Sequence, residues 1–521
     1  MKKIYIWILS LSVLILGCMD DKGNYSYSEL NKITIDNIAW SNSINYGDPL
    51  NITPELSFSL DSVNVSLSYE WIVNGVVIDS TSPELHIESF KEFVGNRRCY
   101  FRVEDNSTGM KYTAEFMVNV SGTYQAGWLI LSEKDNKSYL SYVKEQKKED
   151  DDGNLIEIVY GEETDVYKNV NGTDLGSEPI KLLEHWSSNY SSIGEILVLQ
   201  KSGSVELDGS ALTKAVDTEL EFLGETYPAN FVPKDALYPE ICGYLLSEDG
   251  NVYSRRNDVP KEYHSGRFMA EPMRASGGMR ISHFIPTLYL NSKCILMFDE
   301  LNHRYLACMD TDYKPKLCGE PTVISHKDYP DDFSDLNNMT REIVFAASYE
   351  NPDPWADYEN SVFSILYDRT ENQYYMQNFG IGAVWYTGAI NIAPDYEIPF
   401  PDGDMLNGNN VFAISRKTPY FFFSAGANQE KLYWRDMNDK TGKAHLFDID
   451  FEGHSITSIA VAMNGDRIGV GLDNGIFYLI DATDVGIWKS NVLYKTKNDM
   501  GKIKHVIFKS GARSVFMWGE E

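Results

Sequence analysis

The chain offers few residue patterns that could support catalysis. Its nine histidines show none of the ligand spacings of zinc proteases or zinc fingers. A Gly-x-Ser-x-Gly nucleophile elbow is missing, because Ser276–Gly278 and Ser424–Gly426 lack the leading glycine. Two Gly-x-Gly pairs, at 380–382 and 469–471, do not continue into a phosphate loop, and we interpret them as turn glycines. The sequence therefore predicts no enzyme, no metal site and no cofactor.

Acidic side chains are too numerous to single out a catalytic pair. The chain has 76 Asp and Glu against 46 Lys and Arg, a formal net charge of −30. Glycosidases need two carboxylates, and the sequence neither identifies nor excludes such a couple. The charge does exclude nucleic acid as a partner, because phosphates would be repelled. The acidic run 144–152 lacks the glycine and final glutamate of a calcium loop, so we interpret it as a solvated insertion between two strands.

Aromatic residues are in excess, with 33 Tyr and 10 Trp. Most occupy strand positions, where they are expected to pack. Trp355, Tyr358, Trp385 and Tyr386 depart from this pattern, and nearby prolines favour loops. Amphipathic rings in loops stack well on sugars and peptide faces. We predict a ligand-contact surface formed by these four residues; the alternative is that the loops fold over the core and stabilise it.

Cys18 has the clearest chemical setting of any residue. The basic start Met1–Lys3 leads into the apolar run Ile4–Leu16 and then Gly17. A run this short cannot cross the ~30 Å hydrocarbon core of a bilayer, which requires about 20 helical residues. The motif Ile15–Cys18 resembles the bacterial lipobox, in which the cysteine thiol receives diacylglycerol and becomes the mature N-terminus. We therefore predict a signal peptide at 1–17 and lipidation at Cys18.

The other five cysteines do not indicate a disulfide framework, because their number is odd and their density is low. Cys294 and Cys308 fall on adjacent predicted strands and could pair, as could Cys308 and Cys318. Equally, these side chains could remain buried thiols that pack as small apolar groups.

A polar tether at 18–30 precedes a region, 31–121, with the alternating pattern of short β-strands. Tyr69–Val73 passes through Asn74-Gly75 into Val76–Ile78, a strong hairpin signal because a type I′ turn needs positive φ at both central residues. About seven short strands in roughly ninety residues is the number of an immunoglobulin-like sandwich.

Residues 122–521 carry one recurring unit, an apolar strand, a polar turn and a second strand. The units begin near residues 128, 196, 241, 294, 362, 432 and 468. Their mean step of about 57 residues suits a four-stranded propeller blade with generous loops, whereas a solenoid would have shorter and more regular repeats. Two further strand-like runs at 502–518 could close the ring against the first blade. The Asn74-Gly75 turn and the run Phe101–Asp105 before Gly109 resemble a PKD-type module. The predicted fold is therefore all-β: an immunoglobulin/PKD-like β-sandwich followed by a β-propeller of about seven blades.

Two motifs connect this organisation to a known family. Asp20–Tyr25 reads Asp-Asp-Lys-Gly-Asn-Tyr behind Cys18, and Gly127–Asp135 reads Gly-Trp-Leu-Ile-Leu-Ser-Glu-Lys-Asp at the start of the repeats. With the sandwich between them, they resemble the PKD-like lipoprotein family. That family is associated with Sus-type outer-membrane nutrient importers, in which a TonB-dependent transporter is capped by a binding lipoprotein.

The resemblance implies a lipid-anchored outer-membrane protein, exposed on the cell surface, that has the transporter and its capping lipoprotein as partners. We expect an accessory component that binds a glycan or peptide ligand or docks on the transporter. Two alternatives stay open: a propeller-based glycan lyase or hydrolase on the same membrane, and a purely structural component of the complex.

Overall fold

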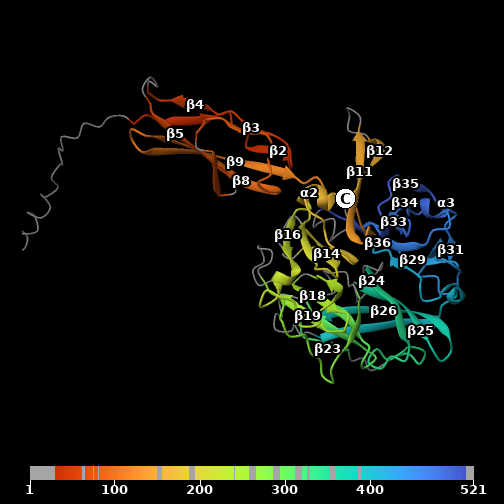
Figure 1. The fold of residues 1–521 in the computed structure, drawn as a ribbon. Helices are drawn as coiled ribbons and strands as arrows, with labels where there is room; N and C mark the ends of the chain where they lie inside the picture. Colours follow the sequence, from red (N-terminus) through yellow and green to blue (C-terminus); the bar gives the residue numbers. More distant parts are fainter. Residues whose placement is uncertain are drawn as a thin grey trace, which may run out of the picture. The chain divides into compact units, whose positions relative to one another are not determined.

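The computed structural model shows a chain that is almost entirely β (Figure 1). It divides into two compact units, 1–119 and 120–521, whereas the sequence analysis placed the junction between 121 and 122. None of the helices in the described part of the chain is long and apolar enough to cross a membrane. The structure describes residues 30–60, 65–73, 75–79, 81–149, 155–186, 194–239, 241–256, 266–285, 294–310, 319–324, 329–350, 360–384 and 389–511.

The described residues of the first unit form a five-stranded sheet and two strand pairs. The large sheet has the order β2 (Ser41–Asn45), β9 (Met110–Ser121), β8 (Gly95–Asp105), β5 (Leu67–Val73), β6 (Val76–Asp79). The pairs are β1 (Ile33–Asp36) with β4 (Glu55–Phe58), and β3 (Leu50–Ile52) with β7 (Leu85–Ile87).

The core of this unit is centred on Trp71. Its ring stacks on Phe101 with centroids 4.2 Å apart and meets the edge of Phe116 at 5.9 Å. All three are fully buried, and each is followed along its strand by outward-facing residues, as the period of two requires. Inward-facing residues of β3 and β7, such as Leu50, are also buried. The predicted sandwich is therefore confirmed.

The described residues of the second unit form seven small antiparallel sheets in chain order, in agreement with the predicted propeller of about seven blades. Blade one joins β10 (Gly127–Lys134), β11 (Lys137–Glu149) and β12 (Leu155–Glu163) to β36 (Lys502–Lys509). Blade two is β13 (Pro179–His185), β14 (Glu195–Gln200), β15 (Val205–Asp208) and β16 (Lys214–Asp217), and blade three is β17 (Pro233–Leu237), β18 (Cys242–Ser247) and β19 (Val252–Arg256). Blade four is β20 (Ile281–Ile285), β21 (Cys294–Asp299), β22 (Arg304–Met309) and β23 (Thr322–Val323).

Three further blades complete the set. Blade five is β24 (Glu342–Glu350), β25 (Asn360–Asp368), β26 (Gln373–Val384) and β27 (Ala389–Pro399). Blade six is β28 (Phe412–Ile414), β29 (Tyr420–Ala425), β30 (Lys431–Asp436) and β31 (His445–Leu446), and blade seven is β32 (Ile456–Val461), β33 (Arg467–Leu472), β34 (Phe477–Asp481) and β35 (Val492–Lys495). In the described connections lie the short helical turns α2 (Val166–Asn171), η1 (Thr218–Glu221), η3 (Gly403–Met405) and α3 (Gly486–Lys489).

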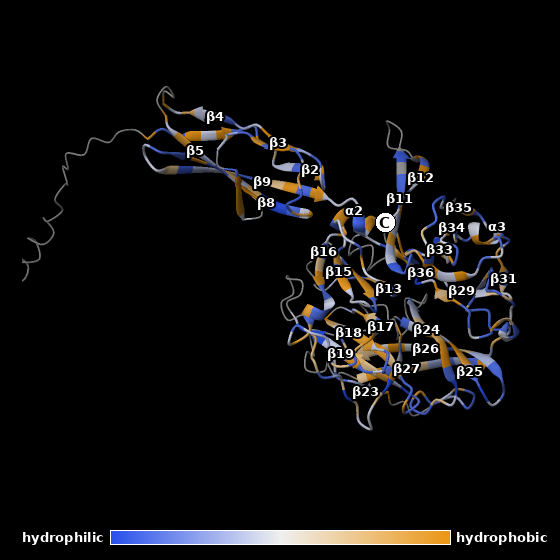
Figure 2. Cartoon of the chain, in the orientation of Figure 1, coloured by the Kyte–Doolittle hydropathy of each residue, from blue (hydrophilic) through white to orange (hydrophobic). Residues whose placement is uncertain are grey.

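The seven sheets form a closed ring. One edge strand of each sheet contacts an edge strand of the next, in the cycle β36, β13, β17, β20, β24, β28, β32 and back to β36. Figure 1 shows the sheets following one another around this ring, and Figure 2 shows hydrophobic residues gathered along their strands. The hydrophobic core is accordingly divided into clusters that lie between neighbouring blades. Ring closure leaves only short, protected sheet edges.

The C-terminal strand closes the ring, as the tail pattern predicted. β36 pairs antiparallel with β10, from Gly127 opposite Lys509 to Glu133 opposite Lys502. The fully buried Trp128 of β10 lies 5.2 Å from the Phe508 ring of β36. The predicted second run, near 515–518, lies outside the described residues.

The glycine pairs lie within strands, so their interpretation as turn glycines was wrong. Gly469 and Gly471 belong to β33, and the pair at 380–382 belongs to β26. A Cβ on Gly469 would lie 2.5 Å from the Trp128 ring, and one on Gly471 would lie 2.4 Å from Ile503. These glycines of β33 therefore allow the last blade to approach the closing sheet.

Register separates the two cysteines on β21 and β22. Cys294 lies opposite Met309, and Cys308 lies opposite Ile295, so the two side chains point to opposite faces of the sheet. They accordingly belong to different hydrophobic clusters and do not pair with each other. Burial raises the pKa of the Cys294 thiol to about 12. Cys318 lies outside the described residues.

Candidate functional site

The residues that the sequence analysis selected lie outside the described part of the chain. Cys18 falls within 1–29, Trp355 and Tyr358 fall within 351–359, and Trp385 and Tyr386 fall within 385–388. Both aromatic segments nevertheless connect described strands of blade five.

The strand registers show where these two connections begin and end. Glu350 pairs with Asn360 at the junction of β24 and β25, and Asn360 pairs with Ile381 of β26. Val384 pairs with Ala389 at the junction of β26 and β27. The strand ends that flank both aromatic segments thus lie at the same end of the sheet. The opposite end of the ring carries the connections from one blade to the next and the turns between the second and third strands of each blade. We call this end the connection face.

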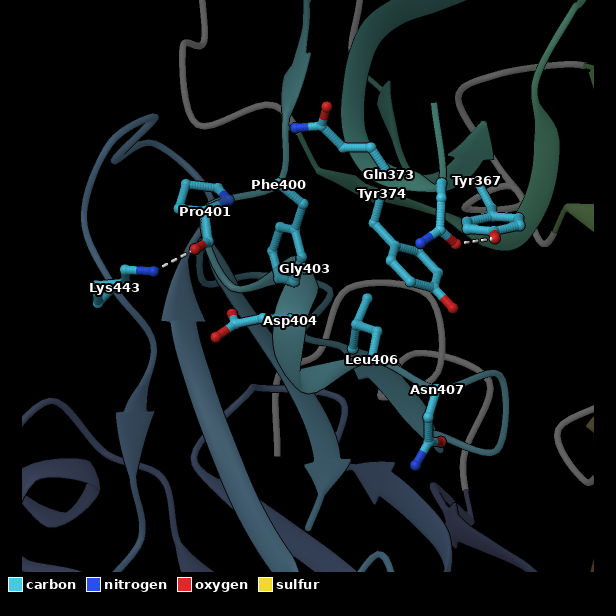
Figure 3. Close-up of a pocket in the computed structure, with 11 residues that line it drawn as sticks. Tyr367, Gln373, Tyr374, Phe400, Pro401, Gly403, Asp404, Leu406, Asn407 and Lys443 are labelled. Atoms are coloured by element: carbon cyan, nitrogen blue, oxygen red, sulfur yellow. Dashed lines mark hydrogen bonds between the residues drawn. The ribbon is translucent and has the colours of Figure 1, made fainter. Parts of the chain in front are cut away.

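At the connection-face end of blade five, residues of blades five and six line a cavity of about 690 Å³ (Figure 3). Its walls come from the turn between β25 and β26, from the connection that contains η3 and joins β27 to β28, and from Lys443, between β30 and β31 of blade six. We call it the blade-five pocket, and its lining residues are Tyr367, Asn372, Gln373, Tyr374, Phe400, Pro401, Gly403, Asp404, Leu406, Asn407 and Lys443.

Two tyrosine rings form one side of the blade-five pocket. The rings of Tyr367 and Tyr374 have centroids 4.8 Å apart and are tilted by 41°. The Tyr367 hydroxyl donates to Asn372 Oδ1 at 2.6 Å, which orients the turn between the strands. The backbone N–H of Phe400 donates to the Tyr374 carbonyl at 2.8 Å and attaches the opposite wall. Figure 3 shows the Tyr374 and Phe400 rings on either side of the space between these walls.

Charged groups at the blade-five pocket form hydrogen bonds and ion pairs with other groups of the protein. The Lys443 ammonium donates to the Pro401 carbonyl and lies 3.8 Å from the Asp402 carboxylate beneath it. Asp402 also pairs with the buried Arg435 at 3.0 Å. Burial, with the neighbouring Tyr367, raises the pKa of Tyr374, so its hydroxyl stays protonated and can donate.

This lining suits binding better than bond cleavage. It supplies aromatic faces, three carboxamides and a single carboxylate, that of Asp404. Glycoside hydrolysis needs two carboxyl groups about 5–9.5 Å apart, and these pocket walls provide one. Saccharides are recognised by ring faces together with neutral hydrogen-bonding groups.

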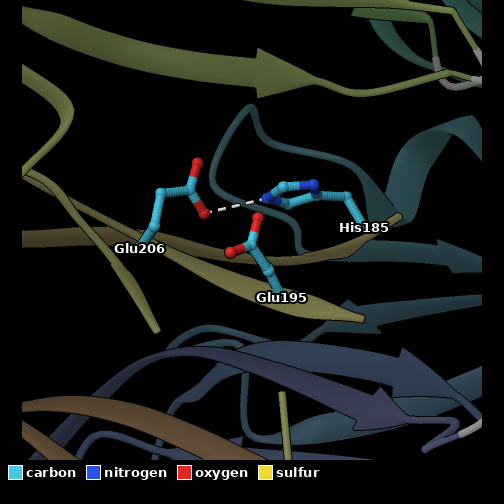
Figure 4. A group of neighbouring side chains, drawn as sticks. All are labelled: His185, Glu195 and Glu206. Atoms are coloured by element: carbon cyan, nitrogen blue, oxygen red, sulfur yellow. Dashed lines mark hydrogen bonds and ion pairs between the residues drawn. The ribbon is translucent and has the colours of Figure 1, made fainter. Parts of the chain in front are cut away.

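A second group of chemically capable side chains lies inside the ring, between blades two and three (Figure 4). His185, Glu195 and Glu206 come from β13, β14 and β15, and their ligand-type atoms all lie within 4.8 Å of one another. His185 Nε2 and Glu206 Oε2 are 2.8 Å apart, and the Tyr238 hydroxyl donates to Glu206 Oε1 at 3.2 Å. The Tyr238 ring stacks on His185 at 4.0 Å.

The His185 group is closed to solvent. His185, Glu195 and Glu206 expose 1%, 3% and 0% of their surfaces. A substrate could not reach these carboxylates without opening the interface between the blades. We therefore interpret the group as a polar contact between blades two and three. Sequence reasoning missed it because its members come from three strands, and only the register brings them together.

Comparison with known proteins identifies the N-terminal third of the chain. Residues 18–179 match the PKD-like family. The match begins at Cys18, spans the first unit and includes β10 to β12 of blade one. A search of curated proteins found no significant match.

Two solved structures resemble the chain loosely. One is a quinonprotein alcohol dehydrogenase-like protein from Bacteroides thetaiotaomicron, 12% identical with a TM-score of 0.39, covering 90% of this chain and 96% of that chain. The other is Sqt1 from Saccharomyces cerevisiae, 9% identical with a TM-score of 0.37, covering 64% and 80%. Structural similarity at this level gives no information about the function of the chain.

Proposed function

We propose that the protein is a lipoprotein of the outer membrane, exposed on the cell surface, that binds glycan as an accessory component of a Sus-type importer. The observation that carries the proposal is that the PKD-like match begins at Cys18, the residue predicted to be lipidated. A family segment that starts at this cysteine agrees with a mature chain whose first residue is acylated. The TonB-dependent transporter and its capping lipoprotein are the proposed partners.

The blade-five pocket supports ligand binding as the molecular activity. Its volume of about 690 Å³ lies in the range of about 300–1,000 Å³ that is usual for ligand sites. Paired tyrosine rings beside carboxamides favour a glycan over a peptide, because no extended strand edge or apolar groove is among the lining residues. The aromatic segments at the other end of blade five would add a second contact surface.

A glycan lyase or hydrolase is the competing proposal. It is less well supported because the blade-five pocket has one carboxylate and the Glu195–Glu206 pair is sealed between blades. The full-length protein, assayed against oligosaccharide and peptide panels for both binding and product release, separates the two functions. Release of shortened or unsaturated sugars would establish the enzyme instead.

The pocket itself is tested by Tyr374→Ala. Loss of one stacking ring is worth about 0.5–1.5 kcal/mol beyond its area, so saccharide affinity should fall about tenfold. Tyr100→Ala is the matched control, since Tyr100 is also partly buried but lies in the first unit. Unchanged affinity in Tyr374→Ala, with the melting temperature preserved, would remove the blade-five pocket from the proposal.

A further inference from the structure

We propose that blade two carries a second saccharide subsite on the connection face, so that the protein binds an extended glycan at two points of the ring. This inference rests on the proposed glycan-binding function and deepens it by naming a polymeric ligand. The subsite is a cavity of about 380 Å³ lined by residues of blade two and its connections.

The two cavities share one feature, which is the second-to-third-strand turn of the blade. The second cavity is bounded by the turn between β14 and β15 and by the connection that leads from α2 into β13. Pro179 at the start of β13 pairs with Gln200 at the end of β14, and Val205 pairs with Asp217 at the end of β16. These residues lie at the end of the sheet that carries the second-to-third-strand turn, which also lines the blade-five pocket. Each cavity is therefore lined by residues at the connection-face end of its blade.

Gln200 supplies the group that points to a ligand. Its side chain is 1% exposed, and its Nε2 donates to the carbonyls of Leu175 at 2.9 Å and Gly203 at 2.7 Å. These two bonds fix the orientation of the amide, because a flipped amide would bring its oxygen against two carbonyl oxygens. Gln200 Oε1 is buried and accepts no hydrogen bond. Unlike the His185 group, Gln200 lines a cavity, and a donor that enters it, such as a sugar hydroxyl, would satisfy this acceptor.

The neighbouring residues indicate a neutral, hydroxyl-rich ligand. Two charged groups of the rim are paired within the protein: Asp174 Oδ1 lies 3.0 Å from the Lys168 ammonium, and Asp217 lies 2.7 Å from that of Lys214. A third, Glu219, accepts a hydrogen bond from Thr226 Oγ1 at 3.1 Å. The two pairs leave little net charge to attract a charged ligand, whereas neutral hydroxyls can hydrogen-bond to the same groups.

A glycan that reaches both cavities gains affinity from multivalency. Once one sugar is bound, the second binds at the effective concentration set by the chain between them, which raises avidity by about 10²–10⁴ where the geometry allows it. The subsite therefore predicts a dependence on chain length that a single pocket would not give.

The test compares short and long sugars on the full-length protein. The probes are maltose with amylose, xylobiose with xylan, and mannobiose with mannan. For the pair that binds, the polymer should bind at least tenfold more tightly than its disaccharide. Thr173→Trp, which places a bulky ring at the exposed rim of the blade-two cavity, should remove this gain and leave disaccharide binding in the blade-five pocket intact.

Two further variants serve as a second test and as a control. Gln200→Leu removes the buried acceptor, but it also releases two carbonyls and could fail to fold, so Thr173→Trp remains the deciding variant. Leu220→Ala is the control, because Leu220 is 43% exposed beside Glu219 and does not line the cavity. The inference is overturned if Thr173→Trp binds the polymer as tightly as the parent protein does. Absence of saccharide binding to the parent would instead overturn the proposed function itself.

Discussion

His505 shows how a single side chain connects ring closure to pH. It lies on the closing strand β36, where its Nδ1 accepts a hydrogen bond from the Leu182 N–H of blade two at 3.3 Å. Burial, together with the nearby Lys181 ammonium, lowers the pKa of His505 to about 3. The imidazole therefore stays neutral in the folded ring at pH values where a free histidine, with a pKa of about 6.5, is charged.

This depressed pKa predicts acid sensitivity. Between pH 6.5 and 3 the unfolded chain binds a proton at this position that the folded chain does not, so folding stability falls as pH falls, by up to about 1.4 kcal/mol per pH unit. His505→Asn keeps an acceptor for the Leu182 N–H but cannot titrate. Its melting temperature should fall less than that of the parent between pH 7 and 5. An equal or steeper fall would show that His505 does not contribute.

The aromatic segments of blade five give a second prediction at this scale. If Trp355 and Trp385 contact ligand, replacing both by alanine should weaken glycan binding by about 5- to 150-fold, because each stacked ring is worth about 0.5–1.5 kcal/mol. The melting temperature should remain nearly unchanged. A protein that instead melts many degrees lower would show that the rings pack against the blade. Calorimetric titration and thermal unfolding of the same samples decide between the two.

Individual residues were the hardest features to predict from the sequence. Aromatic and proline content selected the blade-five segments, but neither the His185 group nor the Gln200 cavity has a sequence signature. His185, Glu195 and Glu206 become neighbours only through the pairing of three strands. Gln200 is distinguished by one buried oxygen, which depends on where the Leu175 and Gly203 carbonyls lie.

At the scale of elements, the recurring strand–turn–strand unit predicted all seven blades but not the position of every strand. In six blades the unit coincides with the second and third strands, whereas in blade six it coincides with the third and fourth, β30 and β31. The missed strand β29 contains Phe421, Phe422 and Phe423, all fully buried.

The packing of β33 against the sheet that closes the ring can be tested by a glycine substitution. Gly469→Ala would place a methyl group against the Trp128 ring at 2.5 Å and Phe477 at 2.8 Å. Overpacking of this kind typically costs about 1–3 kcal/mol, and urea denaturation should show a loss of that size in the free energy of unfolding. Gly161→Ala is the matched control, because Gly161 also lies in a strand of the ring, β12, but has open space around its Cβ position. Equal stability of the two variants would contradict the assigned packing.

For the whole molecule, the sandwich, the ring and the closing tail could be predicted because each follows from hydrophobic periodicity and turn chemistry along the chain. The connection face could not, since it depends on strand direction in every blade. That face now carries both described cavities. A binding face on a rigid ring suits a protein that hands an extended ligand to a neighbouring transporter, which requires the protein to be held at the membrane.

Membrane attachment is therefore the last prediction. Acylation needs the thiol of Cys18, and several acyl chains together anchor a protein stably where one alone does not. Cys18→Ser should move the protein from the membrane to the soluble fraction, or leave its signal peptide uncleaved, as shown by fractionation and by mass spectrometry of the N-terminal peptide. The parent, solubilised in detergent, should co-purify with a TonB-dependent transporter, and the serine variant should lose this association. A serine variant that is still acylated would show that Cys18 is not the lipid acceptor.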